Sequence, residues 1–280
     1  MGKGITLRSN KKVLAALAAV VVVLCAPAAA VARTTIFGSG SSAEQPILNL
    51  LFRAYSRIHR NVAFSYNPDG GNAGVKDVQK GRSALAVNTR PPLPSDSGTT
   101  QFKIFLDGLC VAVNPANSLG NLTISQTKNI FLGLTTAWNS VGGSNLSATI
   151  DPIGRNSTAG SYTFFQSAVL GGKTQASNVN PQTSDGLVAT AIKNDSNAIG
   201  YVGLAHSQPG SGVKTVSLNG VACNQTTIKR ETYPLFRYIW AVVPTAHPSV
   251  PVEKFIDWVR VNHQAGLIIS RAGAVPAFNK

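Results

Sequence analysis

The sequence predicts an α/β fold of two lobes, each with a mostly parallel sheet that helices cover. Short apolar segments of strand length alternate along the chain with segments of helical periodicity, a pattern that is typical of layered α/β folds. Two apolar strand candidates, residues 102–113 and 233–243, are too long for a small sheet. We expect these two strands to cross between the lobes, so that the first lobe is discontinuous and the second is continuous.

The first predicted helix follows a glycine-serine turn at residues 38–42. Apolar residues recur at helical spacing over residues 43–60, at Ile47, Leu50, Leu51, Ala54 and Ile58. The same reasoning predicts further helices at residues 74–80, 125–132, 161–170, 185–193 and 252–263. Apolar runs predict strands at residues 62–66, 84–87, 102–113, 149–153, 198–202 and 233–243.

The first 32 residues have the composition of a secretory signal peptide. Four basic residues accompany an apolar run that begins at Val13, and Ala30-Val31-Ala32 fits a small-residue cleavage site. Cleavage would leave a chain that begins at Arg33. The apolar run is roughly 18 residues long, which is also enough for a retained membrane anchor. We expect a secreted protein, periplasmic or at the cell surface, with the anchor as the alternative.

The chain is basic, with a formal net charge of +14, which favours anionic partners. Lys and Arg are not interleaved with aromatic residues in a ladder, which argues against a single-stranded nucleic acid as the partner. The four histidines are scattered, and no Cys-His spacing predicts a metal site. Cys110 and Cys223 either form a disulfide or remain two buried thiols.

Three strand–loop–helix junctions present glycine or small hydroxyl residues at the start of a helix: residues 38–42, 70–75 and 155–161. Unpaired N–H groups and the helix macrodipole favour an oxyanion there, and such loops converge beyond the carboxyl ends of strands. Arg155 adds a guanidinium fork, whose geometry suits a tetrahedral oxyanion. The sequence therefore predicts an oxyanion site, although the first junction alone is more typical of an ordinary Ser-capped helix.

Short motifs follow one another from Thr35 almost to the C-terminus. They are Gly38-Ser39-Gly40-Ser41-Ser42, the Tyr66–Lys76 turn, Asn129-Ile130-Phe131-Leu132-Gly133 with Trp138, the Arg155–Ser161 loop, Ala198-Ile199-Gly200-Tyr201, Tyr233-Pro234-Leu235 and the closing segment Phe255–Pro276. In order and spacing, these motifs are similar to those of the phosphate-binding proteins of ABC transporters, which have the type II periplasmic binding protein fold.

This resemblance implies a monomeric solute-binding protein without catalytic residues or cofactors. Its first lobe would comprise residues 33–111 and 235–280, and its second lobe residues 112–234. The lobes would close by a hinge over inorganic phosphate and deliver it to a membrane ABC permease.

The resemblance also implies the residues of the site. Ser41 and Ser42 would offer donors from the first lobe, and Gly71 only its backbone, because the family often has a contacting serine there. The full set that the resemblance places around the anion is Ser41, Ser42, Gly71, Thr89, Arg90, Arg155, Ala159, Gly160 and Ser161.

Two departures from the family pattern bear on which anion binds. Many members hold an aspartate after the second strand of the motif series, but Val87-Asn88-Thr89-Arg90 has no carboxylate, and Arg90 is either part of the cradle or a solvated loop cation. Ser157 replaces an acidic residue that commonly orients the arginine. A binding or sensory module for another oxyanion such as sulfate, without a transport role, is therefore the alternative. An enzyme is the weaker rival, because no histidine lies near the serine loops in the sequence.

Overall fold

The computed structural model describes residues 1–4, 33–142 and 148–278. The expected signal segment, apart from its first four residues, and its cleavage site lie outside the described residues. Arg33–Lys280 forms one compact unit. A search of the described residues finds no helix with both the length and the hydropathy that a membrane span needs.

The six predicted helices and six predicted strands all have counterparts, with ends that differ by a few residues. The helices are α1 Gln45–Ile58, α2 Gly71–Gln79, α3 Ile124–Phe131, α4 Gly160–Ala168, α5 Asp185–Asn194, α6 Gln225–Lys229, α7 Val250–Val261 and α8 His263–Arg271, with the 3-10 turns η1 Pro94–Asp96, η2 Trp138–Ser140 and η3 Leu204–His206. The strands are β1 Thr34–Gly40, β2 Val62–Asn67, β3 Leu85–Asn88, β4 Thr99–Val113, β5 Asn121–Leu122, β6 Asp151–Arg155, β7 Asn180–Gln182, β8 Ala198–Gly203, β9 Lys214–Thr215, β10 Ser217–Leu218, β11 Phe236–Pro244 and β12 Val275–Pro276.

The sequence reasoning missed one helix near the C-terminus. The predicted helix at residues 252–263 corresponds to α7, which ends at Val261, and Asn262 has an extended backbone that separates α7 from the unpredicted α8. Its side-chain carbonyl accepts the N–H group of Gln264 at 2.9 Å. An asparagine at this position both ends α7 and caps α8, which is the local signal for the second helix.

The main sheet has ten strands. Its order is β2-β1-β3-β11-β4-β8-β6-β7, with β9 and β12 also paired to β4. Strands β1, β2 and β3 are parallel to one another, as are β6, β7 and β8. The central strands β4 and β11 run antiparallel to each other. In addition, β4 pairs antiparallel with β8, and β11 pairs antiparallel with β3. The sheet of each side is thus mostly parallel, as predicted, and the antiparallel pairings are those of the two long strands.

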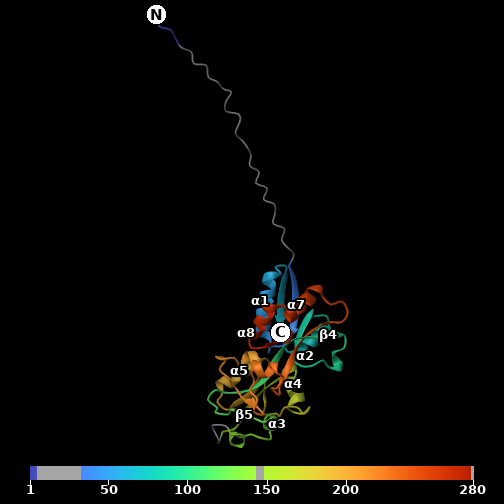
Figure 1. Ribbon diagram of the computed structural model, residues 1–280, viewed down its shortest axis with the longest axis vertical. Helices are drawn as coiled ribbons and strands as arrows, with labels where there is room; N and C mark the ends of the chain where they lie inside the picture. Colours follow the sequence, from blue (N-terminus) through green and yellow to red (C-terminus); the bar gives the residue numbers. More distant parts are fainter. Residues whose placement is uncertain (5–32, 143–147, 279–280) are drawn as a thin grey trace. The chain divides into compact units, whose positions relative to one another are not determined.

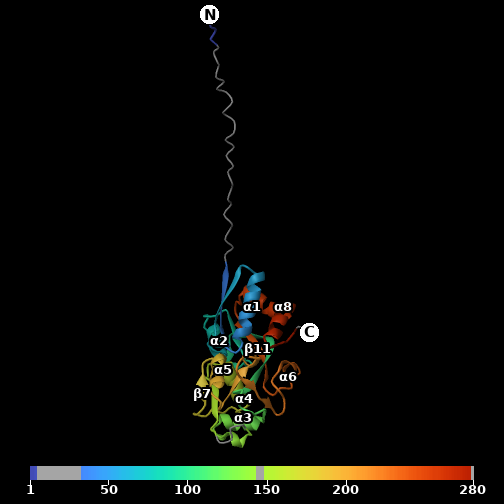
Figure 2. The same ribbon diagram turned by 90° about the vertical axis from the view of Figure 1, so that its left-hand side faces the viewer.

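The two long strands join two regions of the compact unit. We call β1–β3 with α1, α2, α7 and α8 the β1 side, and β6–β8 with α3, α4 and α5 the β6 side. In Figure 1 the blue segments from β1 onward and the red C-terminal helices share the β1 side, and the green to orange middle of the chain forms the β6 side. The view turned by 90° shows the same division, with β11 between α1 and α4 (Figure 2).

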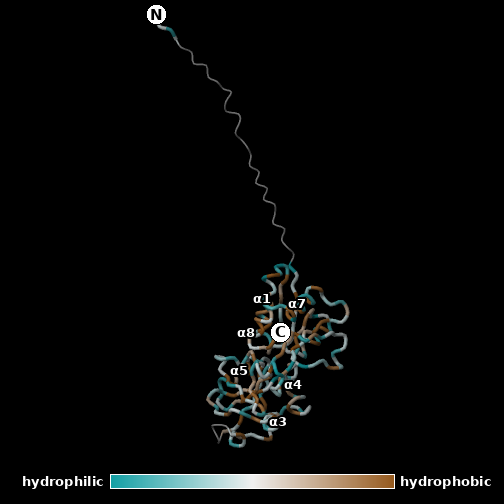
Figure 3. The backbone as a smooth tube through the Cα atoms, in the orientation of Figure 1, coloured by the Kyte–Doolittle hydropathy of each residue, from teal (hydrophilic) through white to brown (hydrophobic). Residues whose placement is uncertain are grey.

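Each region has its own hydrophobic core, and hydrophobic segments occur in both (Figure 3). Along β4, Phe105 belongs to the core of the β1 side and Leu106 to the core of the β6 side. Along β11, Ile239 belongs to the core of the β1 side, and the partly buried Phe236 packs against the core of the β6 side. Both strands therefore contribute to both cores and connect the two regions through packed side chains.

A disulfide joins Cys110 of β4 to Cys223, which precedes α6, with Cα atoms 5.6 Å apart. A Cβ atom on Gly108 would lie 2.9 Å from the Cys223 sulfur. The bridge thus packs directly against the β4 backbone, where a glycine leaves room for it. It closes a loop with a sequence separation of 113 residues.

Candidate functional site

Arg155, the last residue of β6, is the buried cation at the centre of the site. Its side chain is 1% exposed. Its Nε and Nη2 groups donate to the backbone carbonyls of Gln182 at 3.2 Å and Thr183 at 3.0 Å, and Nη1 lies 3.5 Å from the Ser161 hydroxyl. Burial lowers the pKa of Arg155 to about 10, so the guanidinium remains charged at neutral pH.

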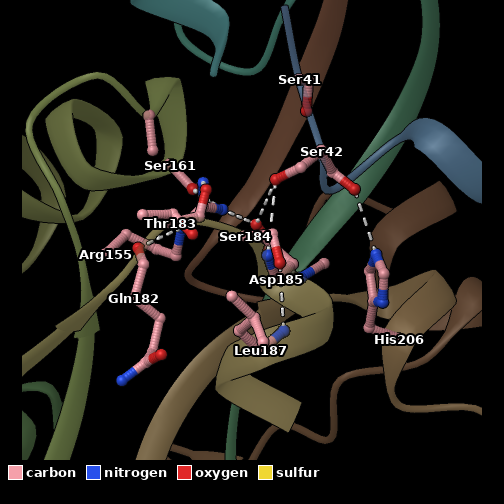
Figure 4. Close-up of polar contacts among 12 residues, drawn as sticks. Ser41, Ser42, Arg155, Ser161, Gln182, Thr183, Ser184, Asp185, Leu187 and His206 are labelled. Carbon is pink, nitrogen blue, oxygen red and sulfur yellow. Dashed lines mark hydrogen bonds and ion pairs between the residues drawn. The ribbon is translucent and has the colours of Figure 1, made fainter. Parts of the chain in front are cut away.

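Asp185, at the start of α5, brings a carboxylate to this arginine. It forms an ion pair with Arg155 and is completely buried. Oδ2 accepts the hydroxyl of Ser42 at 3.4 Å, and Oδ1 accepts the N–H group of Gly203 at 3.1 Å. Figure 4 shows Arg155, Asp185 and Ser42 pointing toward one another from three different elements.

The Ser41–Ser42 loop is held by contacts that only its glycine permits. Gly40 has φ +124°, and a Cβ atom there would lie 2.3 Å from the Val87 carbonyl oxygen. The Ser41 N–H group donates to that carbonyl at 2.8 Å, and Tyr66 donates its hydroxyl to the Ser41 carbonyl at 3.0 Å. The close approach of β1 to β3 therefore orients the loop.

The two serines of this loop face different partners. Ser41 Oγ accepts the N–H group of Glu44 at 3.3 Å, but the N-cap residue of α1 is Glu44 itself and not a serine, so the ordinary Ser-capped helix is not what forms here. Ser42 reaches Asp185 from the β1 side, and its carbonyl lies 3.2 Å from His206 Nε2. Burial lowers the pKa of His206, so the neutral ring donates Nε2–H to this carbonyl. Ser42 is thus the serine that joins the two sides.

A cluster of buried charged groups lies next to the same loop. Arg237 of β11 donates to Asp107 Oδ2 of β4 at 2.7 and 3.1 Å, and it lies 3.6 Å from a Glu44 oxygen. Neither oxygen of Glu44 has a hydrogen-bond donor among the described residues. Burial, and then the nearby Asp107 charge, raise the pKa of Glu44 well above its usual range, against the opposing effect of Arg237. Burial also raises the pKa of Tyr66, and the nearby charge of Glu44 adds to this effect.

The N-terminus of α4 approaches the end of β3 closely. Gly160 and Ser161 begin this helix and are buried, as is its N-cap residue Ala159. A Cβ atom on Gly160 would lie 2.2 Å from Asn88 Oδ1 and 2.8 Å from the Thr89 hydroxyl. The predicted donors of the β6 side therefore meet Thr89 of the β1 side.

Gly71, at the start of α2, approaches the same asparagine. A Cβ atom on Gly71 would also lie 2.2 Å from Asn88 Oδ1, which accepts the Thr89 N–H group at 2.8 Å. Asn88 is fully buried, and its Nδ2 group has no partner among the described residues. The starts of α2 and α4 thus approach the amide oxygen of Asn88, whose amide nitrogen is buried and has no partner among the described residues.

Arg90 is engaged elsewhere. Its guanidinium donates to both oxygens of Asp96 at 2.7 and 2.8 Å, to the Asn72 side-chain oxygen at 2.7 Å and to the Pro91 carbonyl at 2.9 Å. The side chain is buried, so it is not the solvated loop cation that was the alternative. Its charge is compensated by Asp96, and most of its donors are used.

The structure brings Ser42, Arg155 and Ser161 to one place and Gly71, Thr89 and Gly160 to an adjoining one. Sequence reasoning missed Asp185, Asn88 and Asn72. Asp185 had one usable signal, since it begins a predicted helix, where an acidic side chain is favourable. Among the described residues no cluster of three or more His, Cys, Asp or Glu side chains is placed to hold a metal ion.

The pattern of the PBP superfamily domain matches residues 26–261, which is most of the chain. The chain belongs to this superfamily. A relative named phosphate-binding protein PstS from Staphylococcus aureus strain USA300 is 29% identical over 260 residues, covering 87% of this chain and 78% of the relative. Its namesake from Staphylococcus epidermidis RP62A is 28% identical over 239 residues, covering 79% and 73%.

Solved structures of PBP-type proteins share the fold. A protein assigned as a phosphate ABC transporter substrate-binding protein of Clostridium perfringens, solved with bound phosphate, has a TM-score of 0.82 and 23% identity, covering 87% of this chain and all of that one. An ABC-type phosphate transport receptor of Vibrio cholerae has a TM-score of 0.70 and 23% identity, covering 86% and 99%. These likenesses match the two-lobed α/β fold expected of this chain.

Proposed function

We propose that this protein binds a tetrahedral oxyanion, inorganic phosphate first, between its β1 and β6 sides. The observation that supports this proposal is that Ser42 donates to Asp185, which pairs with Arg155, so that residues more than a hundred positions apart in the chain form one buried polar cluster. Arg155 is paired with Asp185, as Arg90 is with Asp96, but its Nη1 group also faces the Ser161 hydroxyl at the long distance of 3.5 Å, where an anion oxygen would bind more tightly. A phosphate oxygen beside Arg155 would accept a charge-assisted hydrogen bond, which is stronger than a hydrogen bond between neutral groups.

The anion would be held by donors from both sides. Ser42 Oγ and Thr89 Oγ1 come from the β1 side, together with the N–H group of Gly71. Arg155, Ser161 Oγ and the first N–H groups of α4, from Gly160 on, come from the β6 side. Helix starts favour an anion because their N–H groups are unpaired, and Asn88 Nδ2 would add a further donor. Arg90 would not contact the anion itself and would support the site by holding the side chain of Asn72.

We propose that Asp185 takes the role of the carboxylate that Val87–Arg90 lacks. Its oxygens accept from Ser42, Gly203 and Arg155, and an ionised carboxylate can accept about four hydrogen bonds in all. One acceptor position thus remains for the proton of hydrogen phosphate. Sulfate has no such proton and would face the carboxylate with an unprotonated oxygen.

The two regions would act as lobes that close over the anion, with β4 and β11 as the hinge. The expected boundaries, residues 33–111 with 235–280 and 112–234, remain part of this proposal, and the separate cores support it. The relatives named above support a further step, delivery of the anion to an ABC permease. We propose a monomeric, extracytoplasmic protein that performs no catalysis.

Isothermal titration calorimetry of residues 33–280 with phosphate, arsenate and sulfate tests the function. We expect phosphate and arsenate to bind at micromolar Kd or tighter and sulfate at least about 100-fold more weakly, because sites built around a hydrogen-bonding group reject analogues lacking it by about 10⁴–10⁵-fold. Asp185→Asn should reduce the difference between the affinities for phosphate and sulfate. No heat with any of the three anions would refute the function, and equal binding of phosphate and sulfate would refute the role of Asp185.

A further inference from the structure

Asn72, the second residue of α2, makes the densest set of polar contacts between the β1 and β6 sides. Its Nδ2 group lies 3.0 Å from the Ser157 carbonyl, 3.3 Å from the Ala159 carbonyl and 2.8 Å from the Thr163 hydroxyl. Its backbone N–H group donates to the Thr158 carbonyl at 3.0 Å. All four partners belong to the loop before α4 or to α4 itself.

The other end of the amide is fixed from within the β1 side. Asn72 Oδ1 accepts Arg90 Nε at 2.7 Å. Arg90 is in turn held by Asp96, which also accepts from Gln101 at 2.9 Å. Burial alone would raise the pKa of Asp96, but these hydrogen bonds outweigh it and lower the pKa. The carboxylate therefore stays charged and holds the guanidinium in place.

This arrangement determines which way the Asn72 amide points. Arginine only donates, so the group that faces Arg90 must be the amide oxygen. The amide nitrogen then faces the 157–163 segment, where two carbonyls and a hydroxyl accept. Arg90 thus selects the orientation in which Asn72 donates across the two sides.

The backbones of Gly70 and Thr158 approach each other closely at this contact. Gly70 has φ +109°, and a Cβ atom there would lie 2.5 Å from the Thr158 carbonyl oxygen. A side chain at this position would push the two segments apart. The approach of α2 to the loop before α4 therefore depends on a glycine beside the asparagine.

We propose that Asn72 is the positioning residue that locks the closed protein, with Arg90 and Asp96 as its support. This rests on the proposed binding of an anion between the two sides. Asn72 does not touch the anion. Opening the cleft must break its hydrogen bonds to the 157–163 segment, whereas an anion that enters an open cleft meets none of them. The lock should therefore act on the dissociation rate and leave the association rate nearly unchanged.

The test is stopped-flow measurement of phosphate association and release with residues 33–280. Asn72→Ala should raise the dissociation rate constant about tenfold or more, since two to three hydrogen bonds are lost, and change the association rate constant less than about twofold. Asn67→Ala is the matched control, because this exposed asparagine bonds only to Asp69 within the β1 side. It should leave both rate constants unchanged.

Two further variants separate the lock from a general loss of structure. Asn72→Asp retains the oxygen that faces Arg90 but presents a carboxylate oxygen to the Ser157 and Ala159 carbonyls, so release should be at least as fast as in Asn72→Ala. Thr163→Val removes one acceptor from the other side and should speed release by a smaller factor. Small-angle X-ray scattering without phosphate should give a larger radius of gyration for Asn72→Ala than for the wild type.

Phosphate release at the wild-type rate in Asn72→Asp, or in a folded Asn72→Ala, would overturn the lock while leaving the anion site intact. Wild-type protein that gives no phosphate signal at all would instead refute the proposed function. An equal loss of association and release rates in Asn72→Ala and Asn67→Ala would identify a general effect on folding and would also count against the lock.

Discussion

At the scale of single residues, two buried carboxyl groups next to the serine loop differ in their partners. Asp185 accepts hydrogen bonds and has Arg155 as its own counter-ion. Glu44 shares Arg237 with Asp107, and its oxygens have no donor among the described residues. Because two carboxylates cannot both be neutralised by one guanidinium, we expect Glu44 to hold a proton at a pH where Asp185 is ionised.

This difference predicts how stability depends on pH. The pKa of Glu44 is raised in the folded protein, so above the ordinary glutamate value of about 4.3 the folded state binds more protons than the unfolded state. The free energy of unfolding should then fall as pH rises, by up to about 1.4 kcal/mol per pH unit. Glu44→Gln should remove this fall, as measured by urea denaturation between about pH 5 and pH 8.

The control for this prediction is Asp257→Asn, which changes an exposed carboxylate of α7. Its stability curve should follow the wild type at every pH. Parallel curves for the wild type and Glu44→Gln would show that Glu44 is ionised in the folded protein, contrary to the expectation.

Single residues also show where sequence reasoning stops. The glycine and serine motifs and Arg155 are recognisable because their chemistry is contained in a short stretch of chain. Asp185 carries no such mark, since its meaning depends on Ser42, which is 143 residues away in the chain. Arg90 was recognisable as a residue of interest, but only the positions of Asp96 and Asn72 show that its donors are already used.

At the scale of elements, the starts of α2 and α4 meet at the end of β3. Local periodicity predicts that these helices exist, and glycine predicts that their starts are special. The contact itself depends on how the two sides pack, which periodicity does not contain. The antiparallel direction of β4 and β11 is likewise set by the route of the chain between the two sides. The break at Asn262 is different, because it is a local signal that competes with a continuing apolar period.

The close contact at α4 predicts the effect of one added methyl group. Gly160→Ala would place a Cβ atom 2.2 Å from Asn88 Oδ1, so Asn88 or the helix start must move. Overpacking of this kind costs about 1–3 kcal/mol, and we expect it to weaken phosphate binding roughly tenfold or more, as measured by calorimetry.

Gly186→Ala is the matched control for that substitution. Gly186 also lies in the first turn of a helix, α5, but a Cβ atom there would have its nearest neighbour at 3.9 Å. Its phosphate affinity should stay within about twofold of the wild type. Equal affinities for both alanine variants would contradict the close packing of α4 against β3.

At the scale of the whole molecule, two cores and one long cross-link hold the chain together. The Cys110–Cys223 bridge closes a loop with a sequence separation of 113 residues. Disulfides typically contribute about 2–4 kcal/mol of stability, and the chain-entropy model gives about 4.7 kcal/mol for a loop of roughly 100 residues. Cys223→Ser should therefore lower the free energy of unfolding by about that amount, measured by urea denaturation without reductant.

The double variant Cys110→Ser/Cys223→Ser should be about as stable as the single variant, since one bond is lost in each. Addition of a strong reductant should lower the stability of the wild type and leave both variants unchanged. A wild-type denaturation midpoint that does not respond to reductant or to Cys223→Ser would contradict a stabilising bridge.

The most direct test of the anion site is the phosphate affinity of Arg155→Gln, measured by calorimetry beside Arg53→Gln. Arg53 is an exposed arginine of α1 on the β1 side, and its loss should leave the affinity unchanged. Arg155→Gln removes the buried cation on which the site depends and leaves the charge of Asp185 uncompensated. We predict a loss of affinity of at least about 100-fold, because charge-assisted hydrogen bonds to a buried anion are strong. A folded Arg155→Gln variant that binds phosphate as tightly as the wild type would contradict the site.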